Sequence, residues 1–211
     1  MTEQVFQDMV ASEEELRALC GFPSELVNNK AITSIDRHCR DFIFRTPLVF
    51  VATSDSAGYC DVSPRGDLPG FVTVIDEQHL VIPERPGNRR FDTLRNILDN
   101  PRIGLIFIIP GLEETLRING QAVIIKDQDI LKQSESFGKI PVLGIGVKVE
   151  ECFIHCAKAF KRSRLWDAAS WPPAQELPVP AVILAEHTKK LGVSVEQIAL
   201  GLKESYEKRL Y

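Results

Sequence analysis

Runs of apolar and β-branched residues, separated by turn residues, dominate the middle of the chain. Residues 48–53 read LVFVAT, and Asp55-Ser56-Ala57-Gly58 separates them from a similar run at residues 59–63. Because β-branched and aromatic residues favour strands, and Asp, Ser and Gly favour turns, the pattern predicts a β-hairpin. Comparable runs predict further strands at residues 71–75, 79–82, 102–109, 115–125 and 144–156.

Two of these runs differ in their patterning. Residues 102–109 are almost wholly apolar, which predicts a strand covered on both faces. Residues 115–125 alternate, so that one face of the strand carries polar groups and the other faces the core. The predicted polar face comprises Thr115, Arg117, Asn119 and Gln121, and the predicted apolar face comprises Leu116, Ile118, Ala122 and Ile124.

Helical spacing is confined to the two ends of the chain and one central segment. Capping-box patterns at Ser12-Glu13-Glu14-Glu15 and at Ser194 to Gln197 predict helix starts. Further helices are predicted at residues 34–44 and 89–100, and a proline-rich crossing at residues 171–180 precedes the two closing helices. About six strands with one central helix favour a small antiparallel barrel over alternating β-α units.

Composition narrows the protein class. The 211 residues are 44% hydrophobic and 26% charged, with a net charge of −4, which argues against disorder and against nucleic-acid binding. No apolar run approaches the roughly 20 residues of a membrane span. The acidic N-terminal segment lacks a secretory pattern, which predicts a cytoplasmic protein. The scattered cysteines are predicted to be buried free thiols in a reducing compartment: Cys20, Cys39, Cys60, Cys152 and Cys156.

The segment Pro83-Glu84-Arg85-Pro86-Gly87-Asn88-Arg89-Arg90 is a candidate phosphate site. We expect Asn88 to cap the following helix and the two arginines to occupy its first turn. Arginine is electrostatically disfavoured at that end of a helix unless an anion offsets the repulsion. The alternative is an ordinary capped helix with solvated arginines.

A second candidate segment, Ser63-Pro64-Arg65-Gly66-Asp67, ends a predicted strand. A hydroxyl, a guanidinium and a glycine that permits close backbone approach suit a ligand, although an ordinary turn has the same composition. Its Arg-Gly-Asp tripeptide also matches a cell-adhesion motif, which we discount because no export signal is present.

These segments, in their order and spacing, resemble the pyridoxamine 5′-phosphate oxidase-like family of FMN-binding split barrels. The tags SPRGD, RPGNRR, TLRNI, NPR and TLRING resemble a bacterial subgroup to which FMN dependence is attributed. The resemblance implies an α+β fold, mainly β, with a six-stranded antiparallel split β-barrel. It also implies one domain over residues 1–211: a helical extension (1–46), the barrel core (47–166) and a C-terminal helical extension (167–211).

The resemblance further implies FMN bound at the interface of a homodimer. Asn88 and Arg90 replace the family's commoner Ser and Lys, and Thr115 stands where a glutamine from the second subunit is usual. The implied cofactor-binding residues are Ser63, Pro64, Arg65, Gly66, Ile82, Pro83, Asn88, Arg89, Arg90, Thr115, Lys161, Ser163 and Trp166.

Two further segments admit alternatives. Residues 158–166 are basic and end in Trp166, so Lys161, Ser163 and Trp166 either cover a planar ring or form a solvated turn against the core. Cys152-x-x-His155-Cys156 suggests a metal, but ligands on opposite faces of a strand cannot close a tetrahedral site, so we predict none.

Flavin itself accepts and donates electrons, so the predicted activity is hydride acceptance from a small-molecule donor, with no catalytic residue identified. Authentic vitamin B6 phosphate oxidases end in an Arg-Leu-x-Pro pattern, whereas this sequence ends Arg209-Leu210-Tyr211, which argues against that substrate. The alternative function is a non-enzymatic flavin or haem binder.

Overall fold

The computed structural model describes residues 5–211. These residues divide into two compact units, one that ends at Ala31 and one that spans Ile32–Tyr211. The first unit holds α1 (Glu13–Cys20) and α2 (Glu25–Asn29). The Ser12 side chain accepts a hydrogen bond from the Glu15 amide at 3.2 Å, as the capping-box pattern predicts. The arrangement as one domain with two helical extensions stays a prediction.

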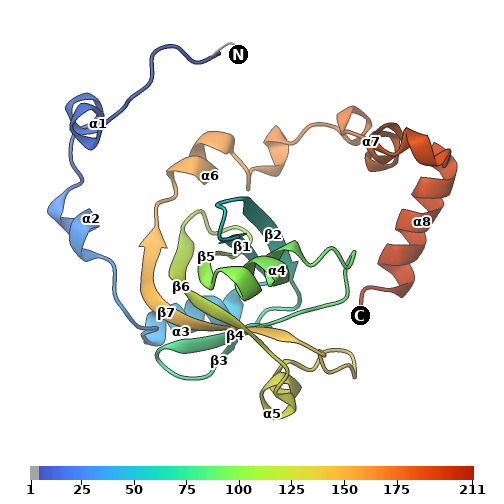
Figure 1. Cartoon of the computed structure of the whole chain (residues 1–211), viewed down its shortest axis with the longest axis horizontal. Helices are drawn as coiled ribbons and strands as arrows, with labels where there is room; N and C mark the ends of the chain where they lie inside the picture. The colour runs from blue at the N-terminus through green and yellow to red at the C-terminus, as the bar shows by residue number, and fades with distance from the viewer. Residues whose placement is uncertain (1–4) are drawn as a thin grey trace. The chain divides into compact units, whose positions relative to one another are not determined.

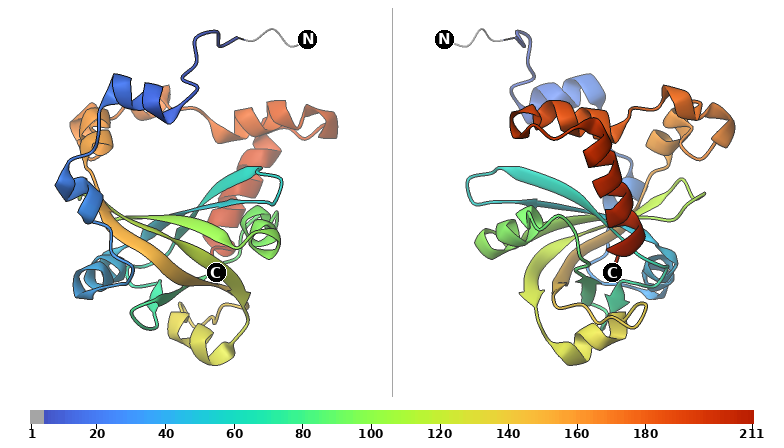
Figure 2. Two further views of the ribbon diagram at one scale, coloured as in Figure 1. Left: turned by 60° about the vertical axis from the view of Figure 1, so that its left-hand side comes forward. Right: turned by 90° about the vertical axis from the view of Figure 1, so that its right-hand side faces the viewer.

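The second unit is built on one antiparallel sheet of seven strands in the order β2-β1-β5-β6-β7-β4-β3. Figures 1 and 2 show the sheet strongly curved, with α4 beside β1 and β2. The strands are β1 (Leu48–Ser54), β2 (Cys60–Gly66), β3 (Thr73–Val74), β4 (His79–Pro83), β5 (Arg102–Ile108), β6 (Thr115–Ile125) and β7 (Gly144–His155).

This sheet confirms the α+β class and the split-barrel-like fold, but the predicted count of six strands is wrong. Thr73–Val74 forms a two-residue strand that pairs with β4 at the edge, and this adds a seventh. Within the described residues the sheet does not close, because β2 and β3 each pair along one side only.

Alternate strand residues and two helices form the core. Along β1, Val49 and Val51 are fully buried, and α3 (Arg37–Arg45) and α4 (Asp92–Asp99) place Ile43, Leu94 and Ile97 in the same cluster. Burying each such side chain contributes about 1.5–3 kcal/mol. Helix α3 begins three residues later than predicted, because the Asp36 carboxylate accepts from the Cys39 amide at 2.7 Å and caps the helix there.

The outer face of the sheet is open, with apolar side chains on β1 and β5 beside polar ones on β6, so the prediction that residues 102–109 are covered on both faces is wrong within this chain. Phe50 of β1 and Ile106 of β5 lie opposite one another, and each is 37% exposed. Pro64 of β2 lies opposite Phe50 on its other side. Their buried neighbours point the other way because strand side chains alternate between faces.

The pairing of β6 with β7 contains a β-bulge between Asn119 and Gly120. A Cβ atom added at Gly120 would overlap the carbonyl oxygen of Lys148 on β7, so the two backbones approach more closely there than any other residue type permits.

The remaining α-helices of the described chain are α5 (Gln128–Leu131), α6 (Lys158–Ser163), α7 (Pro180–His187) and α8 (Val195–Lys208). The predicted capping box of α8 is confirmed, with hydrogen bonds in both directions between Ser194 and Gln197. The proline-rich crossing leads directly into α7, whose first turn contains Pro180. None of the α8 residues is buried, so α8 adds no side chain to the core of this chain.

The cysteines divide between two environments. Cys39 and Cys152 are buried in the core, whereas Cys20, Cys60 and Cys156 are exposed, so the prediction of burial is wrong for those three. Cys156 is exposed because β7 ends at His155, one residue before it.

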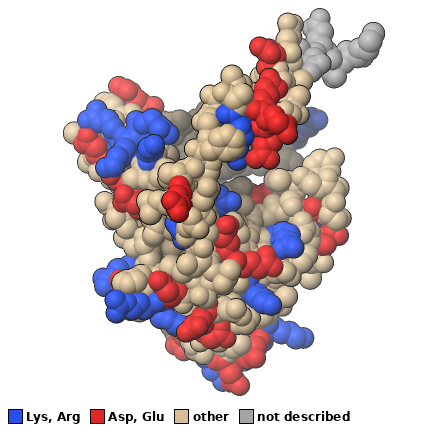
Figure 3. Space-filling model, turned by 90° about the vertical axis from the view of Figure 1, so that its left-hand side faces the viewer, with Lys and Arg blue, Asp and Glu red and all other residues tan. Residues whose placement is uncertain are grey.

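Charges of both signs are mixed over the surface in Figure 3, where small groups of basic side chains lie beside acidic ones. No helix within residues 5–211 is long and apolar enough to cross a membrane.

Candidate functional site

A cavity of about 490 Å³ lies between the end of β2, the end of β4, the loop of residues 84–91 and the start of α4. We call it the β2-loop cavity. It brings together two segments that the sequence separates by about 20 residues. Eight of the predicted binding residues line it: Ser63, Pro64, Arg65, Gly66, Pro83, Asn88, Arg89 and Arg90.

A chain of side-chain hydrogen bonds runs along one wall of the cavity. Arg65 Nη1 donates to Ser63 Oγ at 2.8 Å, and Thr93 Oγ1 donates to Asp61 Oδ2 at 2.7 Å. Ser63 Oγ lies 2.7 Å from Thr93 Oγ1, and because Thr93 gives its proton to Asp61, Ser63 is the donor in that bond. The direction of donation is therefore fixed from Arg65 to Asp61, which orients the guanidinium.

Sequence reasoning missed Asp61 and Thr93. Asp61 could have been found, because residues 61, 63 and 65 alternate along β2 and so share one face of the strand. Thr93 could not, because its role depends on α4 lying against β2.

Arg65 is held from a second side by Glu84, which sequence reasoning also missed as a site residue. The Arg65 Nε to Glu84 Oε2 distance is 2.9 Å, and the two side chains are 16% and 17% exposed. A charge-assisted hydrogen bond in this half-buried setting is stronger than one in open solvent. Glu84 thus positions the guanidinium but also offsets its charge.

The sequence predicted that Arg89 and Arg90 lie in the first turn of the helix, and this prediction is wrong. Helix α4 begins at Asp92, and the backbones of Arg89 and Phe91 have φ angles of 61° and 58°, a left-handed conformation that interrupts helical spacing. The Asn88 side chain accepts from the Arg90 amide at 3.0 Å instead of capping the helix.

The two loop arginines differ in their partners. Arg90 Nε donates to Asp92 Oδ2 at 2.8 Å. Arg89 makes no ion pair with any described residue, so its charge is not offset by a carboxylate of residues 5–211. Arg89 is therefore the cation of this cavity most available to an anionic ligand.

Five predicted residues lie elsewhere. Ile82 is fully buried in the core, and Thr115 is 3% exposed, so the expected exposure of Thr115 is wrong. Thr115 is covered because it starts β6 opposite His155 of β7. Lys161 and Trp166 line a separate cavity of about 480 Å³, where Lys161 pairs with Glu113. The Ser163 hydroxyl donates to the Phe160 carbonyl at 3.1 Å.

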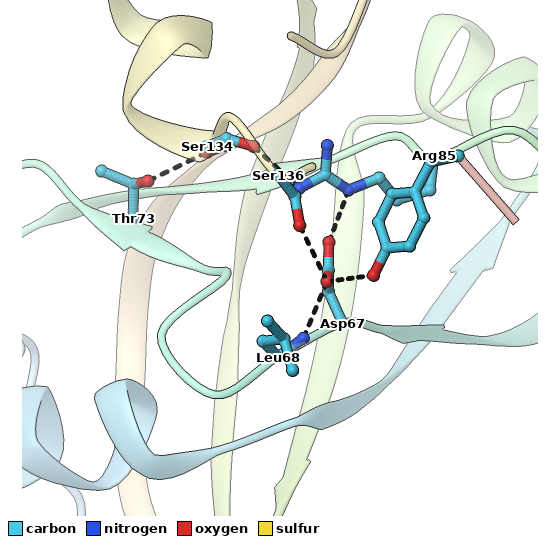
Figure 4. Close-up of polar contacts among 7 residues, drawn as sticks. Asp67, Leu68, Thr73, Arg85, Ser134 and Ser136 are labelled. Carbon is cyan, nitrogen blue, oxygen red and sulfur yellow. Dashed lines mark hydrogen bonds and ion pairs between the residues drawn. The ribbon is translucent and has the colours of Figure 1, made fainter. Parts of the chain in front are cut away.

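Below the β2-loop cavity, Asp67 is the centre of a polar cluster (Figure 4). Its side chain is 1% exposed, and it accepts from Arg85 Nε and from the Tyr211 hydroxyl, both at 2.7 Å. Arg85 also donates to the Ser134 carbonyl at 2.7 Å. Because Asp67 is enclosed, the Arg-Gly-Asp tripeptide is not presented as an adhesion motif.

The pKa of Asp67 lies below its usual value. Burial alone would raise it, but the Tyr211 hydroxyl, the Leu68 amide and the Arg85 guanidinium together outweigh burial by stabilising the carboxylate. The same contact raises the pKa of Tyr211, since the neighbouring negative charge opposes ionisation of the phenol.

We expect Asp67→Asn to destabilise the fold by about 1–3 kcal/mol at pH 7, because it removes a charge-assisted partner of Arg85. Because the folded-state pKa of Asp67 lies below its ordinary value of 3.8, the ionised carboxylate stabilises the fold above pH 3.8. This stabilisation is lost as the pH falls through the lower, folded-state pKa. Urea unfolding at pH 7 and pH 3 measures the difference in unfolding free energy between the wild type and this variant. A difference between wild type and variant that does not shrink at low pH contradicts the assignment.

The family model for pyridoxamine 5′-phosphate oxidase matches residues 35–156, more than half of the chain, and the chain belongs to that family. The predicted resemblance is thus confirmed. The match covers the sheet, loop 84–91 and α4, which together form the β2-loop cavity.

Solved structures show more distant likeness. HupZ of Group A Streptococcus is 22% identical, with 57% of this chain and 93% of HupZ covered and a TM-score of 0.46. A putative pyridoxamine 5′-phosphate oxidase from Lactobacillus delbrueckii is 23% identical, with 59% of this chain and 98% of that protein covered and a TM-score of 0.46. An FAD-binding protein from Mesorhizobium loti is 13% identical, with 60% of this chain and 98% of that protein covered and a TM-score of 0.40. No curated protein matches the chain significantly.

Proposed function

We propose that this protein binds FMN, with the phosphate in the β2-loop cavity, and acts as an oxidoreductase on a small-molecule electron donor. One observation carries the proposal: the cavity presents Arg89 without a carboxylate partner, beside the oriented guanidinium of Arg65. Membership of the pyridoxamine 5′-phosphate oxidase family supports a flavin as the ligand.

The residues of the cavity fit a phosphate monoester. Arginine offers paired N–H donors that match phosphate oxygens, and Arg65 and Arg90 each keep donors beyond those used by Glu84 and Asp92. Gly66 and Gly87 also line the cavity and let a ligand approach the backbone closely. When bound, FMN supplies the hydride chemistry, and the protein positions its ring and phosphate.

We further propose a homodimer that completes the flavin site. The open apolar row of Pro64, Phe50 and Ile106 begins at the β2-loop cavity, because Pro64 lines that cavity. A second copy covering this row would remove exposed apolar surface from water. In this arrangement Lys161, Ser163 and Trp166 reach the flavin from the other copy, whereas the buried Thr115 does not. Light scattering tests the homodimer proposal. A measured mass equal to that of one chain at micromolar concentration contradicts it.

Comparative titration of the ligand-free protein with FMN, riboflavin and haem tests the binding proposal. Riboflavin lacks the phosphate, so we expect FMN to bind at least about tenfold more tightly, as one charge-assisted contact is sufficient for that ratio. Equal affinities for FMN and riboflavin, or haem binding in preference to both, contradict the proposal.

The oxidoreductase part is tested separately by anaerobic addition of NADH, NADPH or a vitamin B6 phosphate to the FMN-loaded protein. Loss of the oxidised flavin absorbance with one of these donors is the expected result. If none of them reduces the flavin, FMN binding stands and the enzymatic proposal is contradicted.

A further inference from the structure

A larger cavity of about 1080 Å³ lies on the other side of loop 84–91, between that loop, residues 139–143 and the C-terminal end of α8. We call it the α8 cavity. Loop residues 84–89 and Phe91 line both cavities, whereas Lys208 and Arg209 line only the α8 cavity. Its volume is slightly above the range of roughly 300–1,000 Å³ that is typical of small-molecule sites.

Positive charge gathers in the α8 cavity without matching negative charge. Lys208, Arg209 and Arg89 all line it, and none of them forms an ion pair with a carboxylate of residues 5–211. The one carboxylate among its lining side chains, Glu84, is already paired with Arg65. In a chain whose net charge is −4, a group of uncompensated cations around one cavity favours an anionic ligand with more than one charge.

Apolar side chains form another part of the cavity's lining. Ile140 and Val142 from one side and Phe91 from the other are exposed and line it. Exposed aliphatic and aromatic side chains beside cations match a ligand that carries both phosphates and a planar or apolar group. A bare inorganic anion would leave this wall unused.

We propose that the α8 cavity is a nucleotide-binding site, in which Lys208, Arg209 and Arg89 hold the phosphates and the wall of Phe91, Ile140 and Val142 receives the base. The site is distinct from the proposed phosphate site for FMN, because Lys208 and Arg209 do not line the β2-loop cavity. The proposal therefore does not depend on flavin binding.

Calorimetric titration with ADP, and with adenosine as the uncharged comparison, tests the site. In Lys208→Ala/Arg209→Ala we expect ADP affinity to fall about 100-fold, or roughly tenfold for each charged contact removed. Lys126→Ala/Lys190→Ala removes the same charge from exposed positions outside the cavities described here, and should leave ADP affinity unchanged.

A second pair of variants separates the two cavities. Arg90→Ala alters only the β2-loop cavity, since neither Arg90 nor its partner Asp92 lines the α8 cavity, so it should weaken FMN binding and leave ADP affinity intact, whereas Lys208→Ala/Arg209→Ala should do the reverse. Loss of ADP binding in Arg90→Ala alone places ADP in the β2-loop cavity and overturns the proposal. Equal ADP affinity in wild type and Lys208→Ala/Arg209→Ala overturns it as well, as does adenosine binding as tightly as ADP.

Discussion

The double variant Arg65→Ala/Arg89→Ala is expected to bind FMN about 100-fold more weakly than the wild type, since two charge-assisted contacts to the phosphate are lost. Arg89 supplies the uncompensated charge, and Arg65 is oriented by Ser63 and Glu84. Loss of Arg65 also leaves Glu84 facing the cavity without its partner, which adds repulsion toward a phosphate. Quenching of flavin fluorescence during titration measures the affinity.

Riboflavin is the internal control for the Arg89 contact, tested on the single variant Arg89→Ala. Because it lacks the phosphate, its affinity should be nearly the same in the wild type and in Arg89→Ala. Arg102→Ala, which removes an exposed arginine paired with Glu150 on the sheet, controls for the loss of positive charge and should leave FMN affinity unchanged. If FMN binds the double variant as tightly as the wild type, the phosphate does not lie at these arginines.

Gly120→Ala is expected to lower the free energy of unfolding by about 3 kcal/mol or more, which is at the upper end for overpacking. The new methyl group would overlap the Lys148 carbonyl oxygen, and the Lys148 carbonyl carbon would lie 3.1 Å from it. These are backbone atoms, so no side-chain rotation relieves the overlap, and the β6–β7 pairing must separate at the bulge. Denaturant unfolding measures the loss.

Gly201→Ala is the matched control. Gly201 lies on α8 with no atom within 4 Å of a built Cβ, and alanine is favoured over glycine inside a helix by about 0.8–1.0 kcal/mol. We therefore expect this second Gly→Ala change to leave stability equal or slightly higher. A Gly120→Ala protein that unfolds at the wild-type denaturant concentration contradicts the close approach of β6 and β7.

The sequence predicted most strands and the two capping-box helix starts, because both depend on local patterns. The hairpin of β1 and β2 follows from alternation around a turn, and the α8 capping box from Ser194 and Gln197. Eight of the residues that line the β2-loop cavity were also predicted, but from the family resemblance as much as from charge.

The errors arise where the backbone departs from its local pattern or where contacts are made at long range. Phe91 has helical spacing with later residues, yet its left-handed backbone places it before α4. The apolar run of β5 indicates burial on both faces, but nothing in the pattern shows whether the second cover comes from the same chain. The Asp61 to Thr93 hydrogen bond joins a strand to a helix 32 residues later, beyond the reach of periodicity.

Loop 84–91 is a common wall of the β2-loop and α8 cavities, and Arg89 lines both. An anion on one side of this wall competes for the same guanidinium as an anion on the other side. Thermodynamic linkage then requires a symmetrical penalty: the factor by which a phosphorylated ligand in one cavity weakens binding in the other is the same in both directions. Arg89→Ala should abolish that antagonism while lowering the affinity for each ligand on its own.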